Sequence, residues 1–382
     1  MFDLPFKSNY PNYSSSEVTL RPTPERVGAT GDYTGQGVTI AFVDSGFSMH
    51  PDIADRVVTY VDASTNHVTE HDHVDHVSVM SWHGQMTSVI AAGDGRTSNG
   101  KYRGIASDSQ LVLIKVSTPD FRLKEADILR GLQWIYDTRH RHQIRVVNVS
   151  VGGDYPSDDP DHPLHRIVRK LHEIGIVVVI AAGNSGQPPL LPPASASHGI
   201  VVGGYDDQNS SDRTRWTLYH HSYGQAHNAT AKPDVLGLAS WVIAPLLPES
   251  DVETEAHWLA QLLRVQTRTD LQTILEASYQ DLDLSHSEIL SMSYKLYQKL
   301  QDKINQHKLV DAHHQHVDGT SVAVPIVASV VAQMLEANPK LTPDQVCHIL
   351  TDTARALPGF PDKLQGAGVL DARHAVETAR LF

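Results

Sequence analysis

The sequence predicts an α/β protein: a doubly wound, mainly parallel sheet with helices on both faces, plus a small helical insertion. Two patterns lead to this fold class. Short apolar runs rich in valine and isoleucine alternate with amphipathic segments, as expected for strands that crossover helices cover on both faces. Two of the runs end on polar residues, Asp44 and Asn184, as expected where parallel strands open onto a crevice. The length of 382 residues accommodates one large domain and an appendage.

The individual elements follow from periodicity. The continuous apolar runs predict strands at residues 38–43, 111–116, 146–150, 176–181 and 200–203. Apolar residues at helical spacing predict helices at residues 83–92, 125–139, 165–173, 320–337 and 342–353. No internal repeat is visible.

Residues 246–317 interrupt this alternation and predict an insertion of two or three helices. Ser250-x-x-Glu253 and Ser285-x-x-Glu288 both have the pattern of a capping box. We therefore divide the chain into an N-terminal extension (1–24), a main domain in two parts (25–245 and 318–382) and the insertion (246–317). The insertion is either a decoration packed on itself or a functional element, namely a lid, an exosite or a self-association surface.

Composition narrows the classes of partner and compartment. The net charge of -13 argues against a nucleic-acid partner. No run approaches the roughly 18 consecutive apolar residues of a membrane span, so we expect no membrane insertion. Cys347 is the only cysteine, which excludes an intramolecular disulfide. No basic start followed by an apolar segment marks the N-terminus, so no signal peptide is seen and we expect a cytoplasmic protein.

Three short motifs together predict nucleophilic catalysis. Asp44 ends an apolar run, His83 precedes a helical pattern, and Ser321 stands in the run Asp-Gly-Thr-Ser. A serine hydroxyl needs a neutral imidazole to take its proton and a carboxylate to orient that imidazole. We assign these roles to Ser321, His83 and Asp44. Each motif alone is a common turn or a surface histidine, and only their conjunction in this order favours catalysis.

The same chemistry needs donors for the oxyanion that forms on the attacked carbonyl. Asn184 follows the apolar run of residues 176–180 and offers a side-chain amide. If Ser321 opens a helix, its backbone N–H is the second donor, at the positive end of the helix. Pro325 fits such a start, because proline is tolerated in a first turn.

These motifs resemble the subtilase family of serine peptidases, over the chain from about residue 25 to the C-terminus. Further stretches that resemble the family are His50-Pro51-Asp52-Ile53, Tyr102-Arg103-Gly104-Ile105-Ala106, Val147-Asn148-Val149-Ser150-Val151-Gly152-Gly153 and Lys232-Pro233-Asp234-Val235. The resemblance implies a serine endopeptidase that acts on peptide or protein substrates and requires no cofactor. It also implies substrate binding by Ser150, Val151, Gly152, Ala182 and Gly183, small residues that leave room for an apolar or aromatic P1 side chain. The chain departs from the family pattern at Val322, Val324 and Ile326 and after the catalytic histidine, at Gly84-Gln85-Met86.

Two alternatives stay open. A catalytically silent subtilase-like scaffold would bind a peptide or protein partner through the same cleft. A metal-dependent hydrolase would use the histidines at positions 67, 71, 73 and 76, or those at 313, 314 and 316, although their spacing matches no closed metal site and we assign none. The resemblance also implies calcium sites, one of which would fall at residues 94–99.

The N-terminal extension allows two expectations. It is too short to fold as an independent inhibitory domain. Its apolar start, residues 2–6, would lie along the cleft as an extended plug, or the extension would be a disordered tail.

Overall fold

The computed structural model describes residues 6–74 and 77–382. The chain forms two compact units. The sheet unit comprises residues 22–242 and 318–382, and the helical unit comprises residues 1–21 and 243–317. The sequence did not predict that the N-terminal segment belongs with the insertion.

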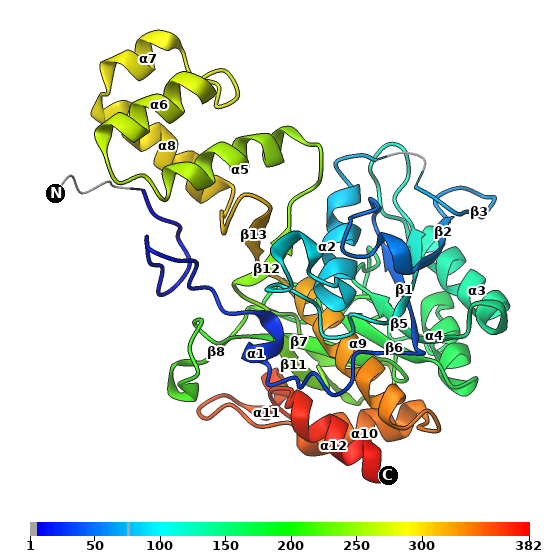
Figure 1. The fold of residues 1–382 in the computed structure, drawn as a ribbon. Coiled ribbons are helices and arrows are strands. Elements are labelled where there is room, and N and C mark those ends of the chain that lie inside the picture. The colour runs from blue at the N-terminus through cyan, green and yellow to red at the C-terminus, as the bar shows by residue number, and fades with distance from the viewer. Residues whose placement is uncertain (1–5, 75–76) are drawn as a thin grey trace. The chain divides into compact units, whose positions relative to one another are not determined.

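The sheet unit is built on a nine-stranded sheet with the order β11-β7-β6-β5-β1-β4-β2-β3, and β8 pairs with β7 (Figure 1). Strands β11 to β2 along this order pair in parallel, whereas β3 and β8 are antiparallel to their partners. The strands are β1 Thr39–Asp44, β2 Val57–Asp62, β3 Thr69–His71, β4 Gln110–Lys115, β5 Ile144–Val149, β6 Val177–Ala181, β7 Ile200–Asp206, β8 Thr217–Leu218 and β11 Val235–Leu238. The short strands β9 (Gly224–Gln225) and β10 (Ala231–Lys232) form a separate pair.

Helices cover both faces of this sheet, which confirms the predicted fold class. Helices α3 (Glu125–His142) and α4 (Pro163–Glu173) pack on one face, and α2 (Ser81–Ala92) and α9 (Thr320–Ala337) on the other (Figure 1). Helix α12 (Ala372–Leu381) packs on α9, and α10 (Pro343–Thr353) packs on α12. The short helices α1 (Thr23–Arg26) and α11 (Asp362–Gln365) complete the unit.

Every strand and helix predicted for the main domain is present, with ends displaced by a few residues. Strands β2, β3, β8, β9, β10 and β11 were not predicted. Thr59 interrupts the apolar run of β2 and Gly237 that of β11, and the other four are only two or three residues long. Gly237 is required there by the tertiary packing, since a Cβ at this position would lie 2.8 Å from the carbonyl oxygen of Ala323 on α9.

Helix α9 is long and apolar enough to cross a membrane by length and composition, a feature that the sequence analysis did not note. Its apolar character has a simpler cause, because 83% of its residues are buried inside the fold. It contacts five strands of the sheet as well as α2 and α12. It is the core helix of this unit.

The helical unit contains four helices, one more than the largest predicted number: α5 Asp251–Leu262, α6 Arg268–Ser278, α7 His286–Ser291 and α8 Tyr294–Gln306. The extra break falls at Met292, whose φ of 41° ends α7, and at Ser293, which caps α8. The capping box at Ser285 is confirmed. The one at Ser250 is only half formed, because the Glu253 side chain accepts the N–H of Glu249 instead. Strands β12 (Val242–Pro245) and β13 (His314–Val317) pair at the base of the insertion.

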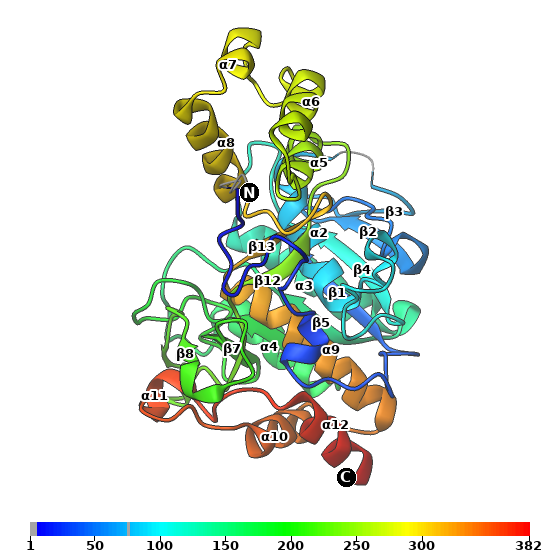
Figure 2. The same cartoon turned by 60° about the vertical axis from the view of Figure 1, so that its left-hand side comes forward.

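The N-terminal segment of residues 6–21 is part of the helical unit's structure. Phe6 is only 4% exposed, lies in the same apolar core as Leu300 and Ile304, and stacks on Tyr297 at 5.8 Å between ring centroids. Asn9 Oδ1 lies 2.7 Å from His316 Nε2 in β13. Figure 2 shows the segment beside β13 and α8. Residues 6–21 are therefore part of the helical unit and not a free tail, and residues 2–5 of the expected plug lie outside the described residues.

We predict that Phe6→Ala destabilises the helical unit by about 3 kcal/mol, the usual cost of truncating a buried phenylalanine. Amide hydrogen exchange followed by mass spectrometry should show faster exchange in α8, by roughly two orders of magnitude if exchange proceeds through unfolding of this unit. Phe121→Ala is the matched control, since Phe121 is 56% exposed. Unchanged exchange of α8 in Phe6→Ala would contradict the assignment of the N-terminal segment to this core.

Candidate active site

Asp44 is the last residue of β1, at the carboxyl end of the parallel sheet, and it is fully buried. Both of its carboxylate oxygens are occupied. Oδ1 accepts hydrogen bonds from the Ser45 backbone N–H at 2.7 Å and lies 2.6 Å from His83 Nδ1. Oδ2 accepts the Thr87 hydroxyl at 2.9 Å. Thr87 lies one helical turn after His83 on α2, and the sequence analysis missed its role in fixing the carboxylate.

His83 is the third residue of α2, and its side chain is 32% exposed. Burial of the ring lowers the pKa of His83, but the charge and the hydrogen bond of Asp44 act in the opposite sense, and the net pKa is raised. Because a carboxylate only accepts, Nδ1 carries the proton that points to Asp44, and Nε2 is left as the basic nitrogen. The next residue must be small, since a Cβ at Gly84 would lie 2.1 Å from the carbonyl oxygen of Gly46.

Ser321 is the second residue of α9, two positions after the N-cap residue Gly319. A helix start leaves its first N–H groups without intrahelical partners, and its dipole favours negative charge at this end. Gly319 has φ of 145°, and a Cβ there would lie 3.2 Å from Ser321 Oγ and 3.7 Å from Asn184 Nδ2. Glycine therefore keeps open the space between these two groups.

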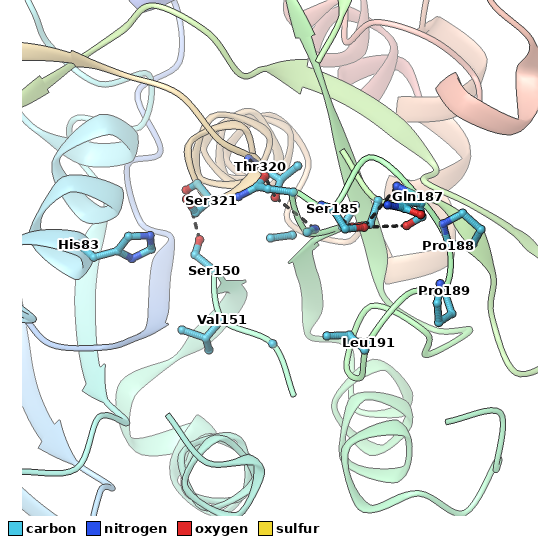
Figure 3. Close-up of a pocket in the computed structure, with 16 residues that line it drawn as sticks. His83, Ser150, Val151, Ser185, Gln187, Pro188, Pro189, Leu191, Thr320 and Ser321 are labelled. Atoms are coloured by element: carbon cyan, nitrogen blue, oxygen red, sulfur yellow. Dashed lines mark hydrogen bonds between the residues drawn. The ribbon is translucent and has the colours of Figure 1, made fainter. Parts of the chain in front are cut away.

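Pro325 was expected in the first turn of this helix, and that expectation is wrong. It is the sixth residue of α9, inside the helix. A residue at this position would normally donate its N–H to the carbonyl oxygen of Ser321, which proline cannot do. That carbonyl oxygen instead accepts the hydroxyl of Ser150 at 3.3 Å (Figure 3), and Asn148 Nδ2 donates to the Ser150 Oγ at 3.0 Å.

Asn184 lies in the loop after β6, and its amide is held in one orientation. Its Oδ1 accepts the backbone N–H of Thr320 at 2.9 Å and the Thr320 hydroxyl at 3.0 Å. The Thr320 hydroxyl in turn accepts the backbone N–H of Gly183 at 3.2 Å. Asn184 Nδ2 donates to no other residue in the described chain, so it is left as a donor beside Ser321.

His83, Ser321 and Asn184 line one pocket of about 470 Å³ (Figure 3). Within the described residues no hydrogen bond joins Ser321 Oγ to His83, and such bonds are often long before substrate binds. The predicted substrate-binding residues Ser150, Val151, Gly152, Ala182 and Gly183 all line this pocket. The other wall of the pocket was not predicted from the sequence. It consists of Ser185, Gln187, Pro188, Pro189, Leu191 and Ser222. The proline-rich run of residues 187–193, directly after Asn184, was the available signal for most of it.

A second serine–histidine pair does not form a competing site. His165 Nε2 lies 2.8 Å from Ser195 Oγ. The two side chains belong to residues that are only 1% and 3% exposed, and the pocket lining does not include them. No carboxylate lies within ion-pair distance of His165 among the residues that the structure describes. A substrate therefore has no access to this pair.

The two histidine clusters, which were considered as metal ligands but not assigned as such, include side chains that contact other residues of the chain. His73 pairs with Asp72, and His314 pairs with Asp311, each at 2.8 Å. His316 contacts Asn9. Position 76 lies outside the described residues, and over residues 6–74 and 77–382 no group of three or more candidate ligands is arranged around a metal position.

The calcium site that the resemblance implies at residues 94–99 does not fit the residues present. Arg96 pairs with two carboxylates: its Nε and Nη2 donate to Asp94 Oδ2 at 2.9 and 2.7 Å, and its Nη2 lies 2.8 Å from Asp55 Oδ2. Asp52 accepts the backbone N–H of Thr97 at 3.0 Å. A guanidinium group thus stands among the carboxylates that a calcium ion would need.

Comparison with known proteins is consistent with this geometry. A model of the subtilase family matches residues 35–368. Serine protease AprX of Bacillus subtilis (strain 168) is 27% identical over 352 residues, which cover 90% of this chain and 67% of that protein. Subtilisin BL of Lederbergia lenta is 29% identical over 178 residues, 46% of this chain and 59% of that protein. A solved protease from Pseudoalteromonas arctica has the same fold, with a TM-score of 0.61 at 19% identity over 94% of this chain and 93% of that chain. The prenylagaramide maturation protease PagA superposes with a TM-score of 0.59 at 17% identity, over 93% of this chain and 96% of that chain.

Proposed function

Because this chain belongs to the subtilase family and is a serine endopeptidase of the subtilisin type, we propose that it hydrolyses peptide bonds through an acyl-enzyme on Ser321. One observation carries the assignment of roles. The buried Asp44 carboxylate holds His83 at 2.6 Å, and His83 lines the same pocket as Ser321 and Asn184.

The proposed reaction begins with attack of Ser321 Oγ on the carbonyl carbon of the scissile bond, while the hydroxyl proton passes to His83 Nε2. Asp44 stabilises the imidazolium that forms. The oxyanion accepts hydrogen bonds from Asn184 Nδ2 and from the backbone N–H of Ser321. His83 then gives its proton to the leaving amine, the C–N bond breaks, and the acyl group remains on Ser321. Water, deprotonated by His83, releases the acid product and restores the serine. Side chains and backbone donors of this chain supply every step, so the proposed chemistry requires no cofactor.

The substrates are peptides or proteins, and we propose that they bind with an apolar P1 side chain in the pocket. Apart from His83, no lining residue carries an ionisable side chain. Val151, Pro189 and Leu191 present apolar surface. A charged P1 side chain would lose its hydration there without gaining a counter-ion.

The silent-scaffold alternative is less well supported, because a scaffold does not need a buried carboxylate that orients a histidine beside an open serine. Self-association through the helical unit is a separate proposal. It is supported by two exposed apolar side chains close in sequence, Leu290 at 58% and Tyr294 at 77%. Sedimentation as a monomer at every concentration would exclude it.

The rate should rise with pH through the ionisation of His83, because only the neutral imidazole accepts the serine proton. Asp44 raises the pKa of His83, so the midpoint in kcat/KM should lie above the ordinary histidine value of about 6.5. Asp44→Asn should move the midpoint to lower pH and reduce kcat by about 10⁴, since the tautomer is no longer fixed. Asp352→Asn, which removes the partner of the surface residue His348, is the control and should shift nothing. A midpoint in Asp44→Asn equal to that of the parent would refute the pairing.

Ser321→Ala should abolish peptide hydrolysis and labelling by a fluorophosphonate probe while leaving the circular dichroism spectrum unchanged. Asn184→Ala should retain labelling and lose about 10²–10³ in kcat, by loss of one oxyanion donor. Asn305→Ala, an asparagine of α8 in the helical unit, serves as a control for Asn184. Hydrolysis by Ser321→Ala at the parental rate would end the proposal, and an unlabelled, inactive parent would favour the silent scaffold.

Cleavage of a denatured proteome, followed by mass spectrometry of the new termini, should show apolar or aromatic residues at P1. Leu191→Asp places a carboxylate in the pocket wall and should increase cleavage after lysine and arginine relative to the parent. A parental preference for charged P1 residues would contradict the proposed role of the pocket.

A further inference from the structure

Five histidines gather around α4 in the sheet unit, outside the active site: His162, His165, His172, His198 and His227. Their rings lie close together. The ring centroids of His162 and His165 are 5.1 Å apart, those of His165 and His227 are 4.9 Å apart, and those of His172 and His198 are 5.1 Å apart. The function proposed above uses none of these side chains.

His165 is the enclosed member of the group, at 1% exposure. Its Nδ1 lies 2.7 Å from the carbonyl oxygen of Asp159, so this nitrogen donates. Nε2 lies 2.8 Å from Ser195 Oγ and accepts its hydroxyl in the neutral ring. Burial lowers the pKa of His165, the carbonyl of Asp159 opposes this, and the nearby His227 and His162 lower it further.

Ser195 connects His165 to the wall of the substrate pocket. Leu191, four residues earlier, lines that pocket. Between them, the carbonyl oxygen of Pro192 accepts the backbone N–H of Gly153 at 2.6 Å, which joins the wall to the segment that follows the substrate-binding residues. The Ser195 carbonyl oxygen accepts the N–H of His227 at 3.0 Å. Through His165, helix α4 thus forms a side-chain hydrogen bond to Ser195 in the segment 187–198.

The charged neighbours of the group are unevenly placed. On α3, Glu125 lies 3.5 Å from His162, and on α10, Asp344 lies 2.9 Å from His172. His198 is influenced by both Arg169 and Glu173 of α4, and burial, then His172 and Arg169, lower its pKa. His198 and His227 share the Ser197 hydroxyl, at 2.8 and 3.1 Å.

Protonation has different consequences for these histidines. A proton on His162 or His172 meets a carboxylate. A proton on His165 lies beside the rings of His162 and His227; the Asp159 charge favours it, but no carboxylate lies within ion-pair distance of His165 in the described part of the chain. Positive charge at the enclosed position is therefore opposed by burial and by its neighbours together.

We propose that His165 is a positioning residue of the substrate pocket, which holds the wall of residues 187–198 through Ser195 while it is neutral and releases it when protonated. The proposal rests on the proposed function for its effect on catalysis. His165 and His83 then respond to different pH ranges, since the pKa of His83 is raised and that of His165 is lowered. Acid should first remove the catalytic base and then, at lower pH, loosen the pocket wall.

The first experiment does not depend on catalysis. Amide hydrogen exchange of the Ser321→Ala protein is measured between about pH 5 and 7.5 and corrected for the intrinsic pH dependence of exchange. Protection of peptides from residues 191–198 should fall at the acid end by about tenfold, because acid favours the form in which His165 is charged and the wall is released. In Ser195→Ala and in His165→Gln, both combined with Ser321→Ala, this dependence on pH should disappear. His348→Gln changes a surface histidine at 61% side-chain exposure and should keep the parental dependence.

The second experiment uses the active protein and measures selectivity. The ratio of kcat/KM for a peptide with a large apolar P1 residue to that for its alanine analogue should fall as the pH is lowered, because only the large side chain needs the wall. Loss of the His83 base affects both peptides equally and cancels in the ratio. Ser195→Ala should remove the pH dependence of the ratio.

Each arm has an outcome that overturns the proposal. Protection of residues 191–198 that stays constant with pH in the Ser321→Ala protein would refute the release of the wall. The same pH dependence in Ser195→Ala as in the parent would assign the effect to another histidine. Inactivity of the parent toward both peptides would count against the proposed function, whereas the exchange result would still decide the role of His165.

Discussion

The hydrogen bond between His83 and Asp44 is the interaction on which the active site depends. It joins the end of β1 to the first turn of α2, and the carboxylate is fully buried with Ser45 and Thr87 on its remaining acceptor positions. A buried carboxylate without such donors would carry a large desolvation cost. With them the carboxylate fixes the tautomer of the imidazole and raises the pKa of His83. The parallel sheet makes this possible, because it brings the ends of consecutive strands to one edge.

The start of α9 contributes to the candidate site through backbone groups that lack their usual hydrogen-bond partners within the helix. Its first N–H groups have no intrahelical acceptors, and Pro325 leaves the Ser321 carbonyl oxygen without its usual donor. Neighbouring segments satisfy these groups selectively. Asn184 takes the N–H of Thr320, and Ser150 donates to the Ser321 carbonyl oxygen. These contacts orient the Asn184 amide and tie the backbone of the proposed nucleophile Ser321 to the pocket-lining residue Ser150, and the proposed oxyanion would accept the Ser321 N–H.

The two units obtain their stability from separate apolar cores. The N-terminal segment and the insertion are far apart in sequence, yet Phe6 and the leucines of α5, α6 and α8 share one core. An insertion of four short helices has little apolar area to bury on its own. The N-terminal segment, with the buried side chain of Phe6, extends its core. In the sheet unit, His165 of α4 occupies a buried position, and its neutral ring is satisfied by Asp159 and Ser195.

The sequence by itself determined the fold class, the five central strands of the sheet, the helices α2, α3, α4, α9 and α10, and the choice of Asp44, His83, Asn184 and Ser321 as the candidate residues. Those features are local, because apolar periodicity and short motifs are written in consecutive residues. The tertiary structure decided the rest. Thr87 as a partner of Asp44, the pocket wall that includes Leu191, the attachment of the N-terminal segment and the burial of His165 beside Ser195 all arise from contacts between distant segments. Neither propensity nor spacing encodes which distant side chain completes a hydrogen bond or fills a core, because only the packed chain fixes their separation.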